Sequence, residues 1–76
     1  MSMQRYKSTV NSGVLAYEIG EDRIKVKFLD GTVYLYTYQS AGEENIEQMK
    51  ALAEKGRGLT TFINQSVSDQ YAIKVS

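Results

Sequence analysis

The chain has 76 residues, with nine basic and nine acidic side chains, a formal net charge of zero, and neither cysteine nor histidine. This length allows one small domain, because folding a chain this short buries only about 60% of its unfolded surface. Without cysteine or histidine there are no disulfides, thiolate nucleophiles, imidazole bases or usual transition-metal ligands. The balanced charge argues against a strongly electrostatic nucleic-acid or membrane protein. We therefore expect a non-enzyme without metal or cofactor.

The N-terminal residues are mostly polar and contain no long apolar run. Residues 1–10 are predicted to be a polar N-terminal extension, and residues 11–76 a single domain. Because no segment near this end is apolar enough for a signal peptide or a spanning helix, a cytoplasmic location without membrane contact is expected.

Two strands with a period of two follow in the chain. Apolar residues alternate at Leu15, Tyr17 and Ile19, and again at Ile24, Val26 and Phe28. Residues 20–23, Gly-Glu-Asp-Arg, have turn composition. A four-residue turn pairs Ile19 with Ile24 and Tyr17 with Val26, so the apolar side chains share one face, and Glu18 lies opposite Lys25.

A second hairpin is predicted around the Asp-Gly pair at residues 30–31, the strongest short-range hairpin signal. It has two registers. A two-residue loop pairs Lys25 with Tyr36 and Lys27 with Tyr34, which creates an outward surface of lysine and tyrosine similar to a nucleic-acid platform.

A three-residue loop over residues 29–31, with Gly31 left-handed at a bulge, gives the other register. It pairs Ile24 and Val26 with the same two tyrosines, which then point into the core. Hydrophobic patterning alone slightly favours the two-residue loop, because that loop buries Val33 and Leu35. The two registers place every side chain of the strand on opposite faces.

The next segment is predicted to be helical. Ser40 and Glu43 have the spacing of a capping box, and a helix is expected to continue to about Lys55. One apolar stripe runs along this helix at Ile46, Met49, Leu52 and Ala53. Gly56 is suited to end the helix in a left-handed cap.

The C-terminal part contains weaker patterns. Leu59, Phe62, Ile63 and Val67 have helical spacing, and Tyr71, Ile73 and Val75 alternate as in a strand. We predict an α+β fold: a three-stranded antiparallel meander, with a candidate short fourth strand, covered on one face by one longer and one short C-terminal helix.

Several residues in order along the chain resemble a known family. The matching positions are Tyr17, then Ile24, Val26, Phe28, Gly31, Tyr34 and Tyr36, then Lys55-Gly56-Arg57-Gly58, and finally Phe62, Ile63, Asn64, Val67 and Tyr71. This pattern resembles the KTSC domain, a small domain found C-terminal to some lysyl-tRNA synthetases. The resemblance implies that residues 11–76 form an antiparallel sheet with helical cover, in a family whose molecular function is not established.

The resemblance also favours one of the two registers. In that family a polar residue commonly stands between the two tyrosines, where this chain has Leu35, and a polar residue there would face solvent. The bulged turn is therefore the preferred interpretation. Val33 and Leu35 then lie outward beside Lys25 and Lys27. These four residues are the predicted surface for a protein partner or for self-association.

A second candidate site consists of Lys55, Arg57 and Asn64, as contacts for a phosphate or RNA. The residues around Arg57 lack the spacing of a P-loop, and a helix-terminating turn is the more ordinary structure for them. Asn64 in a short helical segment more often bonds nearby backbone. We therefore favour a small non-catalytic interaction module that uses the open sheet face, with an RNA-associated accessory domain as the alternative.

Overall fold

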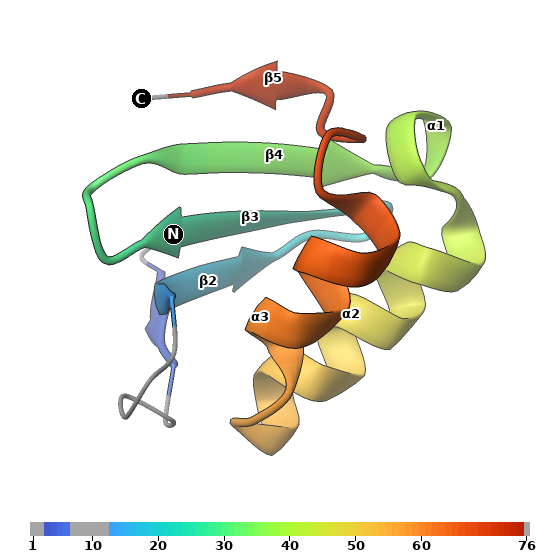
Figure 1. The fold of residues 1–76 in the computed structure, drawn as a ribbon. Helices are drawn as coiled ribbons and strands as arrows, with labels where there is room; N and C mark the ends of the chain where they lie inside the picture. Colours follow the sequence, from blue (N-terminus) through green and yellow to red (C-terminus); the bar gives the residue numbers. More distant parts are fainter. Residues whose placement is uncertain (1–2, 7–12, 76) are drawn as a thin grey trace.

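The computed structural model describes residues 3–6 and 13–75. They form a five-stranded antiparallel sheet with the strand order β1-β2-β3-β4-β5, and the helices cover one of its faces (Figure 1). The predicted α+β architecture is confirmed. The strands are β1 (Gln4–Arg5), β2 (Val14–Ile19), β3 (Arg23–Phe28), β4 (Val33–Thr37) and β5 (Ile73–Lys74), and the helical segments are α1 (Tyr38–Ala41), α2 (Glu43–Lys55), α3 (Leu59–Phe62) and η1 (Ile63–Val67), which is a π-helix.

The first hairpin has the predicted register. Ile19 pairs with Ile24 and Tyr17 with Val26, so the alternating apolar residues reach the same face. At the other end of β2 the register shifts between Val14 and Ala16. This irregularity is a β-bulge, which an alternating pattern does not reveal because one extra residue is inserted locally.

The second hairpin has the register of the three-residue loop. Val26 pairs with Tyr34 and Ile24 with Tyr36. The Gly31 N–H donates to the Phe28 carbonyl at 2.9 Å, and Gly31 has a φ of 90°. Gly31 therefore adopts the left-handed conformation that the bulged turn requires. The preferred interpretation of the two registers is confirmed.

The start of the helical layer differs from the prediction. The capping box pairs Thr37 with Ser40 and starts the short helix α1, whereas the expected box of Ser40 with Glu43 does not form. Gly42, with φ 94° and ψ 143°, then separates α1 from α2. Two capping motifs overlap in this sequence, and the glycine breaks the helix that would have joined them. The end of α2 is as predicted, because Gly56 is its left-handed cap.

The short second helix is confirmed, with an unpredicted change of geometry. It begins as α3 and continues as η1, whose turns are wider than those of an α-helix. Leu59, Ile63 and Val67 are all buried. An α-helical turn has about 3.6 residues, so side chains four residues apart shift slightly around the helix axis. The wider turn of the π-helix offsets this shift. The three side chains consequently stay on the face that packs against the sheet.

One hydrophobic core lies between the sheet and the helices. The sheet contributes Ile24, Val26 and Tyr36, which are almost completely buried. They pack with the buried stripe of α2 and the apolar face of α3 and η1, which together comprise Ile46, Met49, Ala53, Leu59, Ile63 and Val67. The predicted strand near the C-terminus is also present, and β5 pairs with β4 through Tyr34 with Lys74 and Leu35 with Ile73.

The N-terminal strand was not anticipated. Gln4 and Arg5 pair with β2, and Tyr6 is 1% exposed. The Tyr6 hydroxyl accepts a hydrogen bond from the backbone N–H of Leu59 at 3.0 Å. Three of the residues assigned to a polar extension thus belong to the sheet and the core, while residues 1–2 and 7–10 of that segment lie outside the described residues. The predicted domain boundary at residue 11 stays a prediction.

Replacing Gly31 tests the turn that sets the second register. A Cβ at this position would meet no atom within 4 Å, so Gly31→Ala introduces only the strain of a left-handed backbone. We expect a loss of about 1 kcal/mol and a Tm lowered by roughly 4 to 8 °C. Gly31→Asn is the matched control, because asparagine tolerates this conformation and should restore most of the loss. Equal stability of the alanine variant and the wild type would contradict the bulged turn.

Tyr6→Phe tests the contribution of the N-terminal strand. The substitution keeps the ring but leaves the buried Leu59 N–H without its acceptor, which should cost roughly 1 to 3 kcal/mol. Tyr71→Phe is the control, since Tyr71 is 39% exposed and should change stability by less than about 0.5 kcal/mol. Urea denaturation followed by circular dichroism measures both. An unchanged midpoint for Tyr6→Phe would show that β1 does not contribute to the core.

Candidate functional site

The predicted partner surface is assembled on the outer face, which we define as the sheet face away from the helices. Lys25 pairs with Leu35 and Lys27 with Val33 across β3 and β4. Val33 is nevertheless only 9% exposed, and Leu35 is half-buried. The structure thus brings the four predicted residues together. The side chains of Val33 and Leu35, however, are less exposed to solvent than those of an isolated strand would be.

Strand β5 extends this apolar surface. Ile73 lies opposite Leu35, and the Val75 N–H donates to the Val33 carbonyl at 2.7 Å. Ile73 and Val75 are 57% and 49% exposed. We call these four residues, Val33, Leu35, Ile73 and Val75, the outer-face strip. A hollow of about 360 Å³ adjoins it and is lined by Glu18, Ile19, Gly20, Arg23, Lys25, Leu35 and Val75.

The three residues of the predicted RNA contact are not gathered in one place. Lys55 ends α2, and Arg57 stands between Gly56 and Gly58, which both have positive φ. These residues form the helix-terminating turn, since the Gly56 N–H donates to the Leu52 carbonyl at 2.9 Å. Asn64 lines a cleft of which neither Lys55 nor Arg57 is part.

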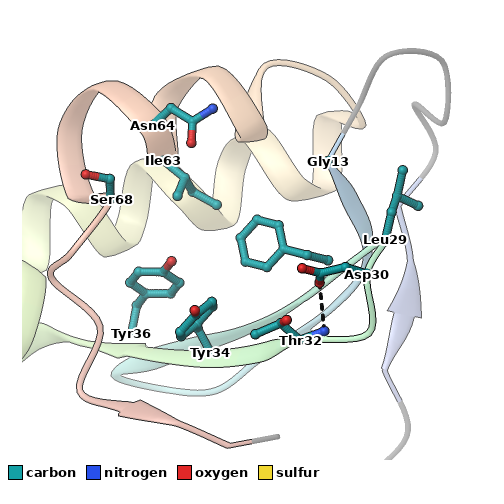
Figure 2. Close-up of a pocket in the computed structure, with 10 residues that line it drawn as sticks. Gly13, Leu29, Asp30, Thr32, Tyr34, Tyr36, Ile63, Asn64 and Ser68 are labelled. Atoms are coloured by element: carbon teal, nitrogen blue, oxygen red, sulfur yellow. Dashed lines mark hydrogen bonds between the residues drawn. The ribbon is translucent and has the colours of Figure 1, made fainter.

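That cleft was not foreseen from the sequence. It has a volume of about 410 Å³ and lies between the second hairpin and the C-terminal helical segment (Figure 2). We call it the aromatic cleft. Its lining comprises Gly13, Phe28, Leu29, Asp30, Thr32, Tyr34, Tyr36, Ile63, Asn64 and Ser68. The sequence signal is the alternation of Tyr34 and Tyr36, which the bulged register directs inward; Tyr36 is in the core, whereas Tyr34 is only partly buried and lines the cleft.

The aromatic rings of the cleft come from the inner face of the sheet. Tyr34 and Tyr36 alternate along β4, and Phe28 is the last residue of β3. The ring centroids of Phe28 and Tyr34 are 5.8 Å apart, with planes inclined at 72°. The ring of Tyr71 packs against that of Tyr34, and their centroids are 4.5 Å apart. Such tilted and edge-on contacts are favourable for aromatic pairs and hold the rings in place.

Polar groups lie around these rings. Asp30 and Thr32 come from the hairpin turn, and Asn64 and Ser68 from η1 and the residue after it. The Thr32 N–H donates to Asp30 Oδ1 at 2.9 Å, and this hydrogen bond is the main reason why the pKa of Asp30 lies below its ordinary value. The Asp30 carboxylate is therefore ionised at neutral pH. The cleft combines aromatic surface with a negative charge.

The third tyrosine of the run belongs to a different cluster. Tyr38 starts α1, and its hydroxyl donates to the Glu47 carboxylate. Lys50 donates to Glu47 Oε2 at 2.9 Å and to the Glu21 carbonyl at 2.8 Å. The hydrogen bond to Glu47 raises the pKa of Tyr38 to about 12, and those from Tyr38 and then Lys50 lower the pKa of Glu47. This cluster joins the turn between β2 and β3 to α2, which is a structural role.

The acidic side chains of the described residues form no metal-binding group, and those with a resolved pKa shift are shifted downward. Residues 3–6 and 13–75 contain no group of three or more acidic, histidine or cysteine side chains that could hold a metal ion. Asp30 and Glu47, the described carboxyl groups with a resolved shift, both have a lowered pKa, which is the wrong direction for a general acid. Within this part of the chain no helix is long and apolar enough to cross a membrane.

Comparisons with known proteins add no identification. No protein-family model, curated protein or solved structure matches this chain. The similarity to the KTSC domain, and the function associated with it, therefore stay predictions.

Titration of Tyr36 tests the environment at the base of the aromatic cleft. Burial, and then the phenols of Tyr34 and Tyr71, raise the pKa of Tyr36 from 10.0 to about 12. The folded state thus favours the protonated phenol, and this stabilisation is complete below about pH 10 and lost as the pH rises to about 12. Tyr36→Phe should remove one late-ionising phenol from the absorbance titration and make stability fall less steeply over this range. Unchanged curves would contradict the buried position of Tyr36.

Proposed function

We propose that this chain is a protein-binding module that uses the outer face of its sheet. The observation that carries this proposal is the outer-face strip, whose members Ile73 and Val75 are about half exposed and continue the apolar row of Val33 and Leu35. Single exposed apolar residues are normal on protein surfaces, whereas a contiguous group on an open sheet marks an interaction site.

The charges beside the strip indicate the chemistry of the partner. Lys25 and Lys27 are directly opposite Leu35 and Val33. On the other side, Ala16 pairs with both Lys27 and Arg5, so Arg5 shares this face. Glu18 pairs with Lys25, and the described part of the face still has an excess of positive charge. The matching partner is a protein segment that combines apolar and acidic residues.

A second copy of the chain fits this surface less well. In a two-fold symmetric contact the same patch meets itself, so the cations of the outer face would approach one another. Like charges across an interface are destabilising. We therefore assign the face to a different protein, and self-association becomes an outcome that the experiment must detect.

The alternative of RNA association has less support in the geometry. Lys25 and Lys27 lie on the outer face, whereas Tyr34 and Tyr36 pair with Val26 and Ile24 and point to the inner face. A platform for single-stranded nucleic acid needs aromatic rings and cations on the same surface. The bulged register separates them.

Selection from a random peptide phage library on the immobilised protein tests the proposal. We expect peptides that contain both acidic and apolar residues and that bind more weakly as salt increases. Ile73→Glu should weaken them at least tenfold, because it places an acid on the exposed part of the strip. The matched control is Leu29→Glu at the hairpin turn, which is 56% exposed and outside the strip, and it should have no effect.

Any of the following outcomes would overturn this assignment. One is basic peptides, or peptides that bind Ile73→Glu as well as the wild type. Another is a wild-type dimer in light scattering that Ile73→Glu converts to a monomer, which would identify self-association. The last is salt-sensitive binding of single-stranded RNA that is lost in the Lys55→Ala and Arg57→Ala double variant, without any peptide binding.

A further inference from the structure

The aromatic cleft has the composition and geometry of a site for an organic cation. It lies on the inner side of the sheet, away from the outer-face strip, so it is independent of the proposed protein-binding surface. Figure 2 shows Tyr34 and Tyr36 side by side beneath Ile63, with Asp30 in the same cleft, and Phe28 also lines it.

The rings of the cleft are inclined at different angles. Phe28 and Tyr34 are inclined at 72° to each other, and Tyr34 and Tyr36 at 53°, with ring centroids 5.8 Å and 6.5 Å apart. The rings therefore pack edge to face or tilted against one another, and the parts of Phe28 and Tyr34 that this packing leaves exposed border the cleft. A stacked pair would instead close the space between them.

Packing holds these rings in position before any ligand arrives. Tyr36 is 1% exposed and belongs to the core, and Tyr71 contacts both Tyr34 and Tyr36. Ile63 of the π-helix forms the opposite side of the cleft. A site with fixed walls loses little conformational entropy when it binds a ligand, which favours affinity.

The charge of the cleft is negative. Among the described lining residues, Asp30 is the charged one, and it is ionised at neutral pH. Its hydrogen bond with the Thr32 N–H keeps the carboxylate at the mouth of the cleft (Figure 2). Lys74, which lies opposite Tyr34 in β5, also attracts this carboxylate, but with the smallest effect on the pKa of Asp30.

Aromatic faces and a carboxylate together favour one class of ligand. The negative face of a ring attracts cations, and methylated or quaternary ammonium groups are recognised by several such rings at once. An anion such as phosphate would be repelled by Asp30. We propose that the aromatic cleft binds a methylated or quaternary ammonium group, with Phe28 and Tyr34 against the methyl groups, Tyr36 at the buried base of the cleft and Asp30 as the counter-charge.

The cleft is large enough for more than the ammonium group. Its volume of about 410 Å³ lies at the lower end of ordinary ligand pockets. Asn64 and Ser68, both exposed, are placed to bind a polar part of the stem that carries the cation. The candidate residue Asn64 thus acquires a role different from the RNA contact for which its sequence position suggested it.

Choline and its neutral isostere 3,3-dimethylbutan-1-ol provide the test. The two have the same shape, and only choline is charged. Titration followed by two-dimensional amide NMR should show saturable shifts around residues 28–36 and 63–68 with choline. We expect the isostere to bind about five- to tenfold more weakly, the range of a partly desolvated cation–π contact.

Variants separate the charge from the rings. Asp30→Asn keeps an oxygen that can accept from the Thr32 N–H but removes the charge, and it should weaken choline binding while leaving the isostere unchanged. Glu54→Gln, an exposed acid of α2 outside the cleft, is the matched control and should change neither. Phe28→Leu should weaken both ligands, and the dispersion of its amide spectrum shows whether it is folded.

Any of four results overturns the proposal. The isostere could bind as tightly as choline, which would show an apolar cleft without selectivity for cations. The shifts could map outside the cleft, or Asp30→Asn could bind choline as well as the wild type does. Absence of saturable shifts with choline and also with a trimethyllysine peptide would likewise exclude a site for this class of ligand.

Discussion

The turn at residues 29–31 determines which face of β4 each side chain occupies. Gly31 is left-handed, and the Phe28 N–H donates to the Thr32 carbonyl at 2.8 Å, which closes the bulged loop. Because side chains alternate along a strand, a slip of one residue would exchange the two faces of β4 completely. Tyr36 would leave the core, and the apolar residues beside it would enter. The core, the aromatic cleft and the outer-face strip all depend on this register.

Strand β4 therefore contributes to two surfaces of different chemistry. Its inner face carries Tyr34 and Tyr36, which extend from the core into the aromatic cleft. Its outer face carries Val33 and Leu35 between the lysines of β3 and the exposed apolar residues of β5. Aromatic surface is thus combined with a carboxylate on one side, and aliphatic surface with cations on the other. These pairings are the reason why we assign an organic cation to the cleft and an acidic partner to the outer face.

Local patterns were sufficient where one segment supplies all of its own determinants. The first hairpin needs only its turn and the alternation of apolar residues, and its register was predicted correctly. The same holds for the end of α2, because Gly56 alone supplies the left-handed cap. The start of the helices was predicted wrongly, since the Thr37 and Ser40 box competes with the Ser40 and Glu43 spacing. Gly42 decides between them by its backbone conformation.

The remaining features depend on residues that are far apart in the chain. Tyr6 is buried, and its hydroxyl accepts a hydrogen bond from the N–H of Leu59, 53 residues later. The aromatic cleft exists because the hairpin rings face the π-helix across the edge of the core, and Tyr71 packs against Tyr34 from beyond that helix. Neither contact has a signature in a short window of sequence.

By itself, the sequence determined the three central strands, the main helix, the α+β class and a choice of two registers, because these follow from periodicity and turn chemistry within a few residues. Only the tertiary structure decided how open each candidate site is. Val33 is covered once β5 pairs beside it, and Asn64 lines the same cleft as Asp30 although the two residues are far apart along the chain. Exposure and proximity of this kind are properties of packed elements, and the local pattern of any one element does not contain them.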